Sequence, residues 1–492
     1  MLYLIWSLPM LALAALMLSG RVTVSMAALA GLAVAALVAF AAAPQAFGLP
    51  ELGQALLRGG WIGFTIAPYI LGGLLFWQTA MDGRKPAESA VAKAACAAYV
   101  SDSLAKRRRI FFACFLIGPF AESATGFGVG MVGTIALLSR FGIAPRHLMV
   151  FGLLSQTYIP WGAMGSGTLL AAAYARLPAP LLSLYVILPA ALLMLVWLPL
   201  YWRTIRACGL AAVPGESLRE AGWIAASLVL LALASKYLGP ETALLSAFGP
   251  LIVLRHLVDE RPPMRNFLQT ARRSLPYLVL ILALLVTRLA PGLKESLGAL
   301  VYVAPFADLP AWMPVMHAGS WLIGGAFLTA VLTGRTGSMP ALLASTWNTA
   351  RHAVFTVFVF SMMAEVLSMA AISKALAQGM FSWLGAGALV VSPLISAAFG
   401  ILTNSSNAPN SLFMPSLVAL TSQAGLSVPM TAALQQAAGA CLSIFSPVRM
   451  TIAAGLSQGK GEERQVYARL LPYMGLSFLL IGLSALLLVA AG

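Results

Sequence analysis

A single carboxylate stands inside a long apolar stretch of the chain. Residues 110–139 read IFFACFLIGPFAESATGFGVGMVGTIALLS, and Glu122 is the acidic residue among them. A charged carboxylate at the centre of a bilayer costs about 2.5 to 3.5 kcal/mol on insertion scales, so it faces the protein interior or carries a proton. We therefore predict that Glu122 carries a coupling proton, and the alternative is a structural partner for a nearby basic residue.

Small polar residues and glycines accompany this carboxylate and recur far along the chain. Near Glu122 they are Ser123, Thr125, Gly126 and Gly128. A second polar cluster, GILTNSSNAPNSLF at residues 400–413, contains Asn404, Ser405, Ser406, Asn407 and Asn410. Non-helical backbone at membrane depth occurs only where protein or a watery cavity satisfies its polar groups. Both clusters are therefore candidate binding sites for a small substrate.

Each polar cluster is followed by a segment whose sequence predicts a broken helix. The two segments are SQTYIPWGAMGSGT at residues 155–168 and QQAAGACLSIFSPVRMT at residues 435–451. Interrupted membrane segments at corresponding places in two halves of a chain indicate the substrate site of a transporter. Their candidate substrate-binding residues are Gln156, Thr157, Ser446 and Arg449.

Charged side chains near these breaks could bind an anion or couple its movement to an ion. Arg449 can hold a carboxylate bidentately, and the alternative is an arginine that snorkels to the membrane surface. Glu365 lies in another apolar run and is a further coupling candidate, with a structural ion pair as its alternative. The four histidines lack the spacing of metal ligands, so we predict neither a metal nor a cofactor.

The composition predicts the elements that must position these residues. Hydrophobic residues make up 60% of the chain, charged residues 9%, and the mean hydropathy is +0.90. Soluble chains carry roughly 25% charged residues, and repeated apolar runs of about 20 residues favour helices over a β-barrel. We predict an all-α polytopic membrane protein in which residues 1–492 form one unit, with about 12 to 14 membrane segments.

Basic residues collect in a few loops, so the net charge of +15 reports orientation and not an affinity for nucleic acid. The most basic loops are predicted at 82–109 and 255–275, and smaller ones at 203–220 and 458–469. The positive-inside rule places all of them in the cytoplasm and the N-terminus outside.

The crossings between these loops predict the path of the stretch around Glu122. Residues 148–172 and 181–202 already make one round trip, so residues 110–139 must return to the side from which they came. We therefore predict a re-entrant hairpin, or two half-helices, at 110–139 and a counterpart at 397–420. Each of two related halves would then hold one hairpin and one broken helix.

Four motifs in this order resemble those of the bacterial L-lactate permeases, which also accept glycolate. ESATGFG at Glu122–Gly128 resembles the family pattern EGAAGFG, and YIPWGAMG at Tyr158–Gly165 resembles APVAFGALG. LTNSSNAPNSLF at Leu402–Phe413 resembles LTGSDTSSNALF, and IFSPVRMTIAAG at Ile444–Gly455 resembles MISPQSIAIA. The similar order and spacing cover most of the chain from the third apolar run onward.

The resemblance implies a multi-pass protein of the bacterial inner membrane that carries small 2-hydroxy monocarboxylates together with protons. It also implies kinship with the wider ion transporter superfamily, whose members are commonly homodimers with an elevator-like moving domain. The chain departs from the family at three positions. Ser406 replaces an acidic residue, Ser443 a basic one, and Arg449 a small polar residue. These departures bear on the cargo more than on transport.

Two other functions remain open. A sodium-coupled or exchange carrier for another organic anion could hold Na⁺ through the oxygens of the Asn- and Ser-rich cluster. A membrane-embedded enzyme acting on lipids would need paired acids for Mg²⁺ or a His/Asp/Glu cluster. Glu122 and Glu365 are far apart in the sequence, so we predict a transporter and not an enzyme.

Overall fold

The computed structural model of the chain describes residues 2–81, 102–126, 128–210, 213–260 and 263–491, and most of these residues form helices. One isolated bridge, between Val303 and Trp312, is the extended pairing within these ranges. The predicted basic loop 82–109 lies outside the described residues up to residue 101, as does Phe127 of the ESATGFG motif.

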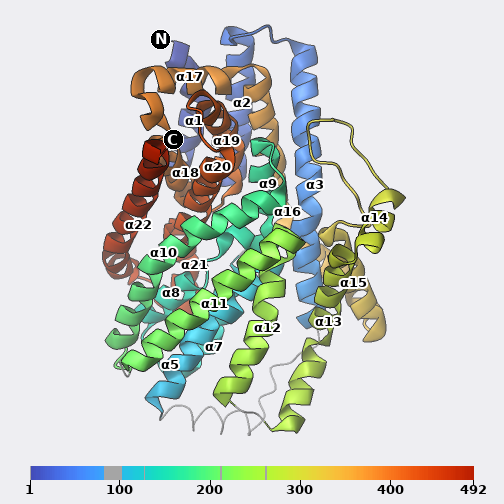
Figure 1. The fold of residues 1–492 in the computed structure, drawn as a ribbon, viewed down its shortest axis with the longest axis vertical. Helices are drawn as coiled ribbons and strands as arrows, with labels where there is room; N and C mark the ends of the chain where they lie inside the picture. The colour runs from blue at the N-terminus through green and yellow to red at the C-terminus, as the bar shows by residue number, and fades with distance from the viewer. Residues whose placement is uncertain (1, 82–101, 127, 211–212, 261–262, 492) are drawn as a thin grey trace.

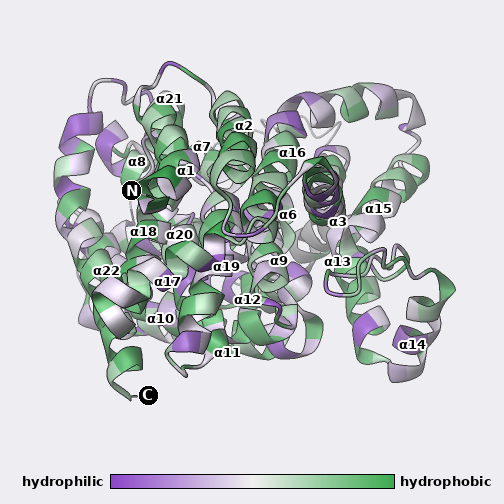
Figure 2. Ribbon diagram, turned by 90° about the horizontal axis from the view of Figure 1, so that it is seen from above, coloured by the Kyte–Doolittle hydropathy of each residue, from purple (hydrophilic) through white to green (hydrophobic). Residues whose placement is uncertain are grey.

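Many helices are long and apolar enough to cross a membrane. Within the described ranges they are Val24–Ala42, Leu49–Ala80, Ala179–Ala207, Pro214–Leu238, Pro240–Glu260, Thr336–Met369, Ile372–Thr403, Val428–Ser457 and Glu463–Ala491. The bent pair Leu275–Leu289 and Pro291–Leu300 adds a tenth span if it counts as one. Hydrophobic residues occupy these helices at the periphery as well as in the interior (Figure 2). The chain is thus a polytopic, membrane-embedded helical protein, as the composition predicts.

One long helix, α3 (Leu49–Met81), organises one side of the molecule (Figure 1). It packs along α16 (Met339–Met369) and α15 (Ala318–Leu332), with α2 (Val24–Ala42) beyond α16. Glycines allow the close approach: a Cβ on Gly59 would overlap the backbone of Met362 on α16. These helices form a wall against which the remaining elements pack.

The stretch around Glu122 forms a helical hairpin. The chain passes through α5 (Ser103–Phe112), the π-helical turn η1 (Ala113–Ile117) and α6 (Gly118–Thr125), and returns as α7 (Val129–Leu138). Gly126 (φ 71°) and Gly128 (φ 77°) make the turn, because both adopt backbone conformations that favour glycine. Antiparallel packing follows: a Cβ on Gly130 would overlap the carbonyl of Gly118, and Thr134 donates to the carbonyl of Ala113 at 3.2 Å.

A second hairpin lies in the C-terminal part of the chain. It consists of α18 (Ala388–Thr403) and α19 (Asn407–Gln423), which pack against each other across a short turn. Asn404 takes φ 54° in this turn, a conformation that asparagine tolerates better than most residues. Figure 1 shows α18 and α19 toward one end of the molecule and α5 and α7 toward the other. The two hairpins thus extend inward from opposite ends.

Both predicted breaks are present as interruptions between helices. The first runs from α8 (Pro145–Leu154) through η3 (Ile159–Trp161) to α9 (Gly162–Ala175), with positive φ at Ala163, Met164 and Gly165. The second runs from α20 (Val428–Cys441) through η6 (Leu442–Phe445) to α21 (Pro447–Ser457). Helix α21 packs against α8, and α20 packs against α9. The two interruptions therefore lie close together.

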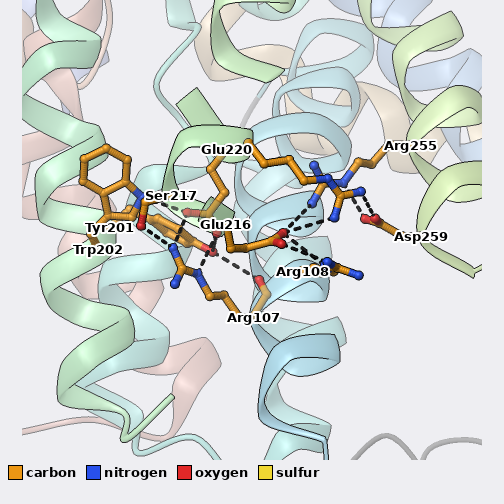
Figure 3. Close-up of polar contacts among 10 residues, drawn as sticks. Arg107, Arg108, Tyr201, Trp202, Glu216, Ser217, Glu220, Arg255 and Asp259 are labelled. Carbon is orange, nitrogen blue, oxygen red and sulfur yellow. Dashed lines mark hydrogen bonds and ion pairs between the residues drawn. The ribbon is translucent and has the colours of Figure 1, made fainter. Parts of the chain in front are cut away.

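A cluster of ion pairs joins α5 to two later helices (Figure 3). Arg107 pairs with Glu220 at 2.6 Å, and Arg108 with Glu216 at 2.9 Å. These contacts join α5 to α11 (Pro214–Leu238). The guanidinium of Arg255 lies over the rings of Phe111 and Trp223, which places α12 (Pro240–Glu260) in the same cluster.

The basic segment 255–275 differs from its prediction as a loop. Helix α12 continues to Glu260 and α13 (Met264–Leu289) begins shortly after it. Charge suggested a loop, but Arg255 and Asp259 pair at 2.5 Å one turn apart, which stabilises the helix end instead. The remaining helices are α1 (Leu2–Leu18), η2 (Ser139–Phe141), α10 (Ala179–Ala207), α14 (Pro291–Leu300), η4 (Thr336–Ser338), α17 (Ile372–Leu384), η5 (Gly385–Gly387) and α22 (Glu463–Ala491).

Candidate functional site

A cavity of about 480 Å³, here called the tip cavity, lies where both hairpin turns and both helix breaks meet. Residues that the sequence singled out line one side of it: Glu122, Gly126, Gly128, Asn404, Ser405, Ser406, Asn407 and Arg449. The opposite side comes from the first turn of α2, from Ile70 on α3, and from His352 and Thr356 on α16. Positions more than 300 residues apart in the sequence thus share one cavity.

The carboxylate of Glu122 accepts hydrogen bonds that stabilise the turn of the first hairpin. Its Oε1 accepts the N–H of Gly128 at 3.1 Å, and its Oε2 accepts the N–H of Gly130 at 3.1 Å. The side chain of Gln156 donates to the same Oε2 at 3.3 Å. Both backbone donors belong to the first turn of α7, where the helix dipole favours a negative charge. Three donors and no acceptor are the hydrogen-bond pattern of an ionised carboxylate.

Arg449 brings a buried positive charge to the same place. Its Nη1 donates to Oε1 of Gln156 at 2.5 Å, so one amide side chain joins the arginine to Glu122. The Nε atom of Arg449 is buried and has no hydrogen-bond partner in the structure. A buried N–H without a partner is costly, and a bound anion would satisfy it.

The second turn contributes amide and hydroxyl groups. The Oδ1 atom of Asn404 is buried without a hydrogen-bond partner. Ser405 Oγ accepts the N–H of Asn407 at 3.1 Å, which shapes the turn. Ser406 lies against α9, because a Cβ on Gly167 would overlap its hydroxyl. The turn therefore presents unsatisfied oxygen to the cavity while its backbone is fixed locally.

Asn410, a predicted binding residue, lies behind the turn and not on the wall of the tip cavity. Its amide donates to the carbonyl of Gly167 at 3.1 Å and to Oε1 of Gln436. Gln436 in turn donates to Thr168 at 2.9 Å. These bonds link α19 to α9 and α20, so Asn410 holds the second hairpin against both broken helices. Gln436 lies in the predicted break segment, but nothing in its sequence position indicated this role.

Gln156 lies between Glu122 and Arg449 and does not line the cavity itself, and neither do four further predicted residues. Thr125 donates to the carbonyl of Ala121 at 2.7 Å, and Ser446 caps α21 by accepting the N–H of Val448 at 3.3 Å. Ser123 and Thr157 are buried, and their hydroxyl oxygens have no hydrogen-bond partner. The structure thus gives Thr125 and Ser446 local structural bonds, and a direct substrate contact by any of the four stays a prediction.

Glu365 lies away from this cavity, in a separate cluster of ion pairs here called the latch. Arg58 pairs with Glu365 at 2.7 Å and with Asp308 at 2.7 Å, and Asp308 also pairs with Arg176 at 2.8 Å. The hydrogen bond from Arg58 holds the pKa of Asp308 down at about 2, despite partial burial. The latch joins α3, α16, the loop before α15 and the end of α9.

A second cavity of about 500 Å³ adjoins the latch. Its walls include Thr65 and Tyr69 of α3, Ala173 of α9, and His317. His317 is buried and donates Nε2–H to the carbonyl of Thr65 at 2.9 Å. Burial lowers the pKa of His317 to about 4. The second cavity and the tip cavity lie along the same stretch of α3, because Ile66 lines one and Ile70 the other.

His352 is the titratable residue of the tip cavity that sequence reasoning did not select. It is one of the four histidines that lack the spacing of metal ligands, and no neighbouring residue marks it. Its place depends on how α16 packs against the hairpins, which no local pattern reveals. Within the described ranges, no group of three or more His, Cys, Asp or Glu side chains could hold a metal ion.

The fold and site define a polytopic helical membrane protein with a cavity to which two hairpin turns and two broken helices contribute polar side chains. A comparison with models of known protein families and with curated proteins finds no match.

Proposed function

We propose that the protein is a secondary transporter, and not an enzyme, for small 2-hydroxy monocarboxylates such as L-lactate and glycolate. The observation that carries the proposal is the tip cavity, in which Arg449 offers a buried, unpartnered N–H beside two polar turns. Arginine is suited to bind a carboxylate in this way. The four sequence motifs that resemble lactate permeases border the same cavity or build the elements around it.

The arrangement of the helices supports alternating access. The two hairpins extend from opposite ends of the molecule and each has a broken helix beside it (Figure 1). In this proposal the hairpins are re-entrant, and each belongs to one of two related halves. The group formed by the hairpins and broken helices moves against the wall formed by α3 and α16. The protein then acts in the bacterial inner membrane, and as a homodimer by analogy with the superfamily.

Proton symport is the proposed form of coupling. Moving one anion into a cell against an interior-negative potential costs about 2.3 kcal/mol per 100 mV. One accompanying proton cancels the transported charge. Glu122 is the proposed proton carrier, since it is the acidic side chain that lines the tip cavity.

A sodium-coupled carrier is the second candidate, and one observation favours it. The Oδ1 atom of Asn404 is a buried acceptor without a partner at the edge of the tip cavity. Amide, carbonyl and hydroxyl oxygens are suitable ligands for a hard cation. In this case Na⁺ would occupy the second turn and Glu122 would remain ionised throughout transport.

Uptake of labelled L-lactate into proteoliposomes tests the proposal. Wild-type protein should accumulate lactate when the interior of the proteoliposomes is made alkaline. Arg449→Gln should lower this uptake at least tenfold, which corresponds to a loss of about 1.4 kcal/mol of binding free energy. Arg335→Gln, remote from the cavity lining, is the matched control. Uptake that ignores the pH gradient but requires Na⁺ would favour the second candidate. Absence of lactate uptake under every gradient would exclude this cargo.

A further inference from the structure

Gln156 stands between the two buried charges of the site and is itself fully buried. Its Nε2 donates to Glu122 at 3.3 Å, and its Oε1 accepts from Arg449 at 2.5 Å. An amide has one donating and one accepting end. The observed orientation therefore suits a carboxylate that can only accept and a guanidinium that can only donate.

A proton on Glu122 would reverse this preference. A protonated carboxyl group has an O–H donor, which needs an acceptor. Gly128 and Gly130 offer only N–H groups, so neither can accept it. The carbonyl end of Gln156 can, after the amide turns over by half a turn. The NH₂ end would then face Arg449, donor against donor, and Nη1 of Arg449 would be released.

We propose that Gln156 is a positioning residue that makes Arg449 available to the cargo anion when Glu122 takes up a proton. This inference rests on the proposed function and deepens it. With Glu122 ionised, Arg449 is bound to Gln156 through Nη1 and its charge is compensated. With Glu122 protonated, both Nη1 and the unpartnered Nε of Arg449 face the carboxylate of the anion. Proton and anion then bind together, and by linkage each raises the affinity for the other.

Few other groups can account for a pH dependence at this site. Helix α6 packs against η1, η3, α3, α7, α9 and α12. Neither η3 nor α7 carries an ionisable acid or base, and η1 contributes the thiol of Cys114, which donates to the carbonyl of Phe151 at 3.5 Å. The charged groups of α3, α9 and α12 have partners elsewhere: Glu51 with the N–H of Gly48, Arg58 with Glu365 and Asp308, Arg176 with Asp308, Glu241 with Arg288, Arg255 with Asp259 and Glu216, and His256 with Glu260. Arg146 and His147 lie at the far end of α8 from Gln156. His352 faces the cavity from α16 and is the competing titratable group.

The coupling of Glu122 protonation to anion binding through Gln156 is here called the relay. Calorimetric measurement of L-lactate binding to the purified full chain between pH 5 and 8 tests it. For wild type, the dissociation constant for lactate should decrease as the pH is lowered. The decrease should be at most about tenfold per pH unit, the limit for one linked proton. Titrations in buffers of different ionisation enthalpy should show about one proton taken up per lactate. Gln156→Met keeps the length of the side chain but not the amide. Its dissociation constant should change less than about twofold over the same range, without proton uptake.

Two further variants decide between the possible sources of the pH dependence. The dissociation constant of Glu122→Gln for lactate should depend on pH as little as that of Gln156→Met. The dissociation constant of His352→Gln should keep the wild-type dependence on pH. Gln156→Asn, whose shorter amide cannot reach both partners, repeats the test should the methionine variant not fold. The relay is overturned if the dissociation constant of Gln156→Met or Gln156→Asn depends on pH as that of wild type does. It is also overturned if the dissociation constant of His352→Gln does not change with pH. Wild-type lactate binding without proton uptake overturns the relay alone, and no binding at any pH overturns the proposed cargo.

Discussion

Glu122 has a structural role in the hairpin whatever its part in transport. Replacing it by alanine removes the acceptor of the Gly128 and Gly130 N–H groups and leaves the positive charge of Arg449 uncompensated. Leaving a buried donor without its acceptor costs about 1 to 3 kcal/mol. We expect Glu122→Ala to lower the free energy of unfolding in detergent by this amount, as measured by chemical denaturation. Glu295→Ala, at an exposed position on α14, should change it by less than about 0.5 kcal/mol.

His317 should make the stability of the protein depend on pH. Its pKa of about 4 in the fold lies below the value of about 6.5 in an unfolded chain. The unfolded state therefore binds more protons between these values, so stability is complete above pH 6.5 and falls as the pH drops toward 4. The loss should reach about 3 kcal/mol.

Thermal denaturation of His317→Gln and of wild type across this pH range checks the prediction. The variant should lose the pH-dependent part that His317 contributes, while His256→Gln, at a partly exposed position paired with Glu260, should behave like wild type. Parallel pH profiles for wild type and His317→Gln would contradict it.

At the residue scale the sequence revealed charges but not their partners. Glu122 and Arg449 stand out because each interrupts an apolar run, and both line the tip cavity. The bond from Arg449 to Gln156 spans 293 positions, and its direction depends on where two broken helices cross. His352 has no local signal at all. Partners of this kind follow from tertiary packing alone.

Glycines on α3 allow neighbouring elements to approach, and one of them contacts the first hairpin. A Cβ on Gly73 would overlap the carbonyl oxygen of Ala124, at the end of α6. We expect Gly73→Ala to lower the free energy of unfolding by about 1 to 3 kcal/mol, the usual cost of overpacking. Gly53→Ala in the same helix meets no atom within 4 Å and should be neutral or stabilising by up to about 1 kcal/mol. Denaturation of the two variants side by side measures the difference, and equal stabilities would contradict it.

At the element scale, patterns that depend on backbone chemistry were informative. The glycines after Glu122 predicted a turn, and Gly126 and Gly128 make it with positive φ. Charge patterns were less informative about secondary structure: the basic segment 255–275 is mostly helical, because its charges pair along and between helices. The interruption of α9 at Ala163 and Met164 has non-glycine residues at positive φ, which propensity alone does not predict.

At the scale of the whole molecule, two cavities lie on either side of the contact between α3 and α9. The tip cavity touches Ile70 and Gly167, and the second cavity touches Ile66 and Leu169. The latch lies beside the second cavity, and it ties the end of α9 to α3 through Asp308. In the proposed mechanism the latch therefore holds the end of α9 closed against α3 beside the second cavity.

Asp308→Asn should loosen this closure, because it removes the charge that Arg58 and Arg176 share. Asp308 is about half exposed, with side-chain relative accessibility 51%, so solvent screening limits the effect to about 1 kcal/mol, equivalent to a two- to fivefold change. A cysteine at Ala173, placed in a chain whose native cysteines are replaced by alanine, should react two to five times faster with a membrane-impermeant thiol reagent in the Asp308→Asn background. Asp308→Glu retains the charge and should react at nearly the original rate. If Asp308→Asn left the rate unchanged, the latch would be a fixed structural contact, and the barrier between the two cavities would have to lie in the apolar packing of α3 against α9.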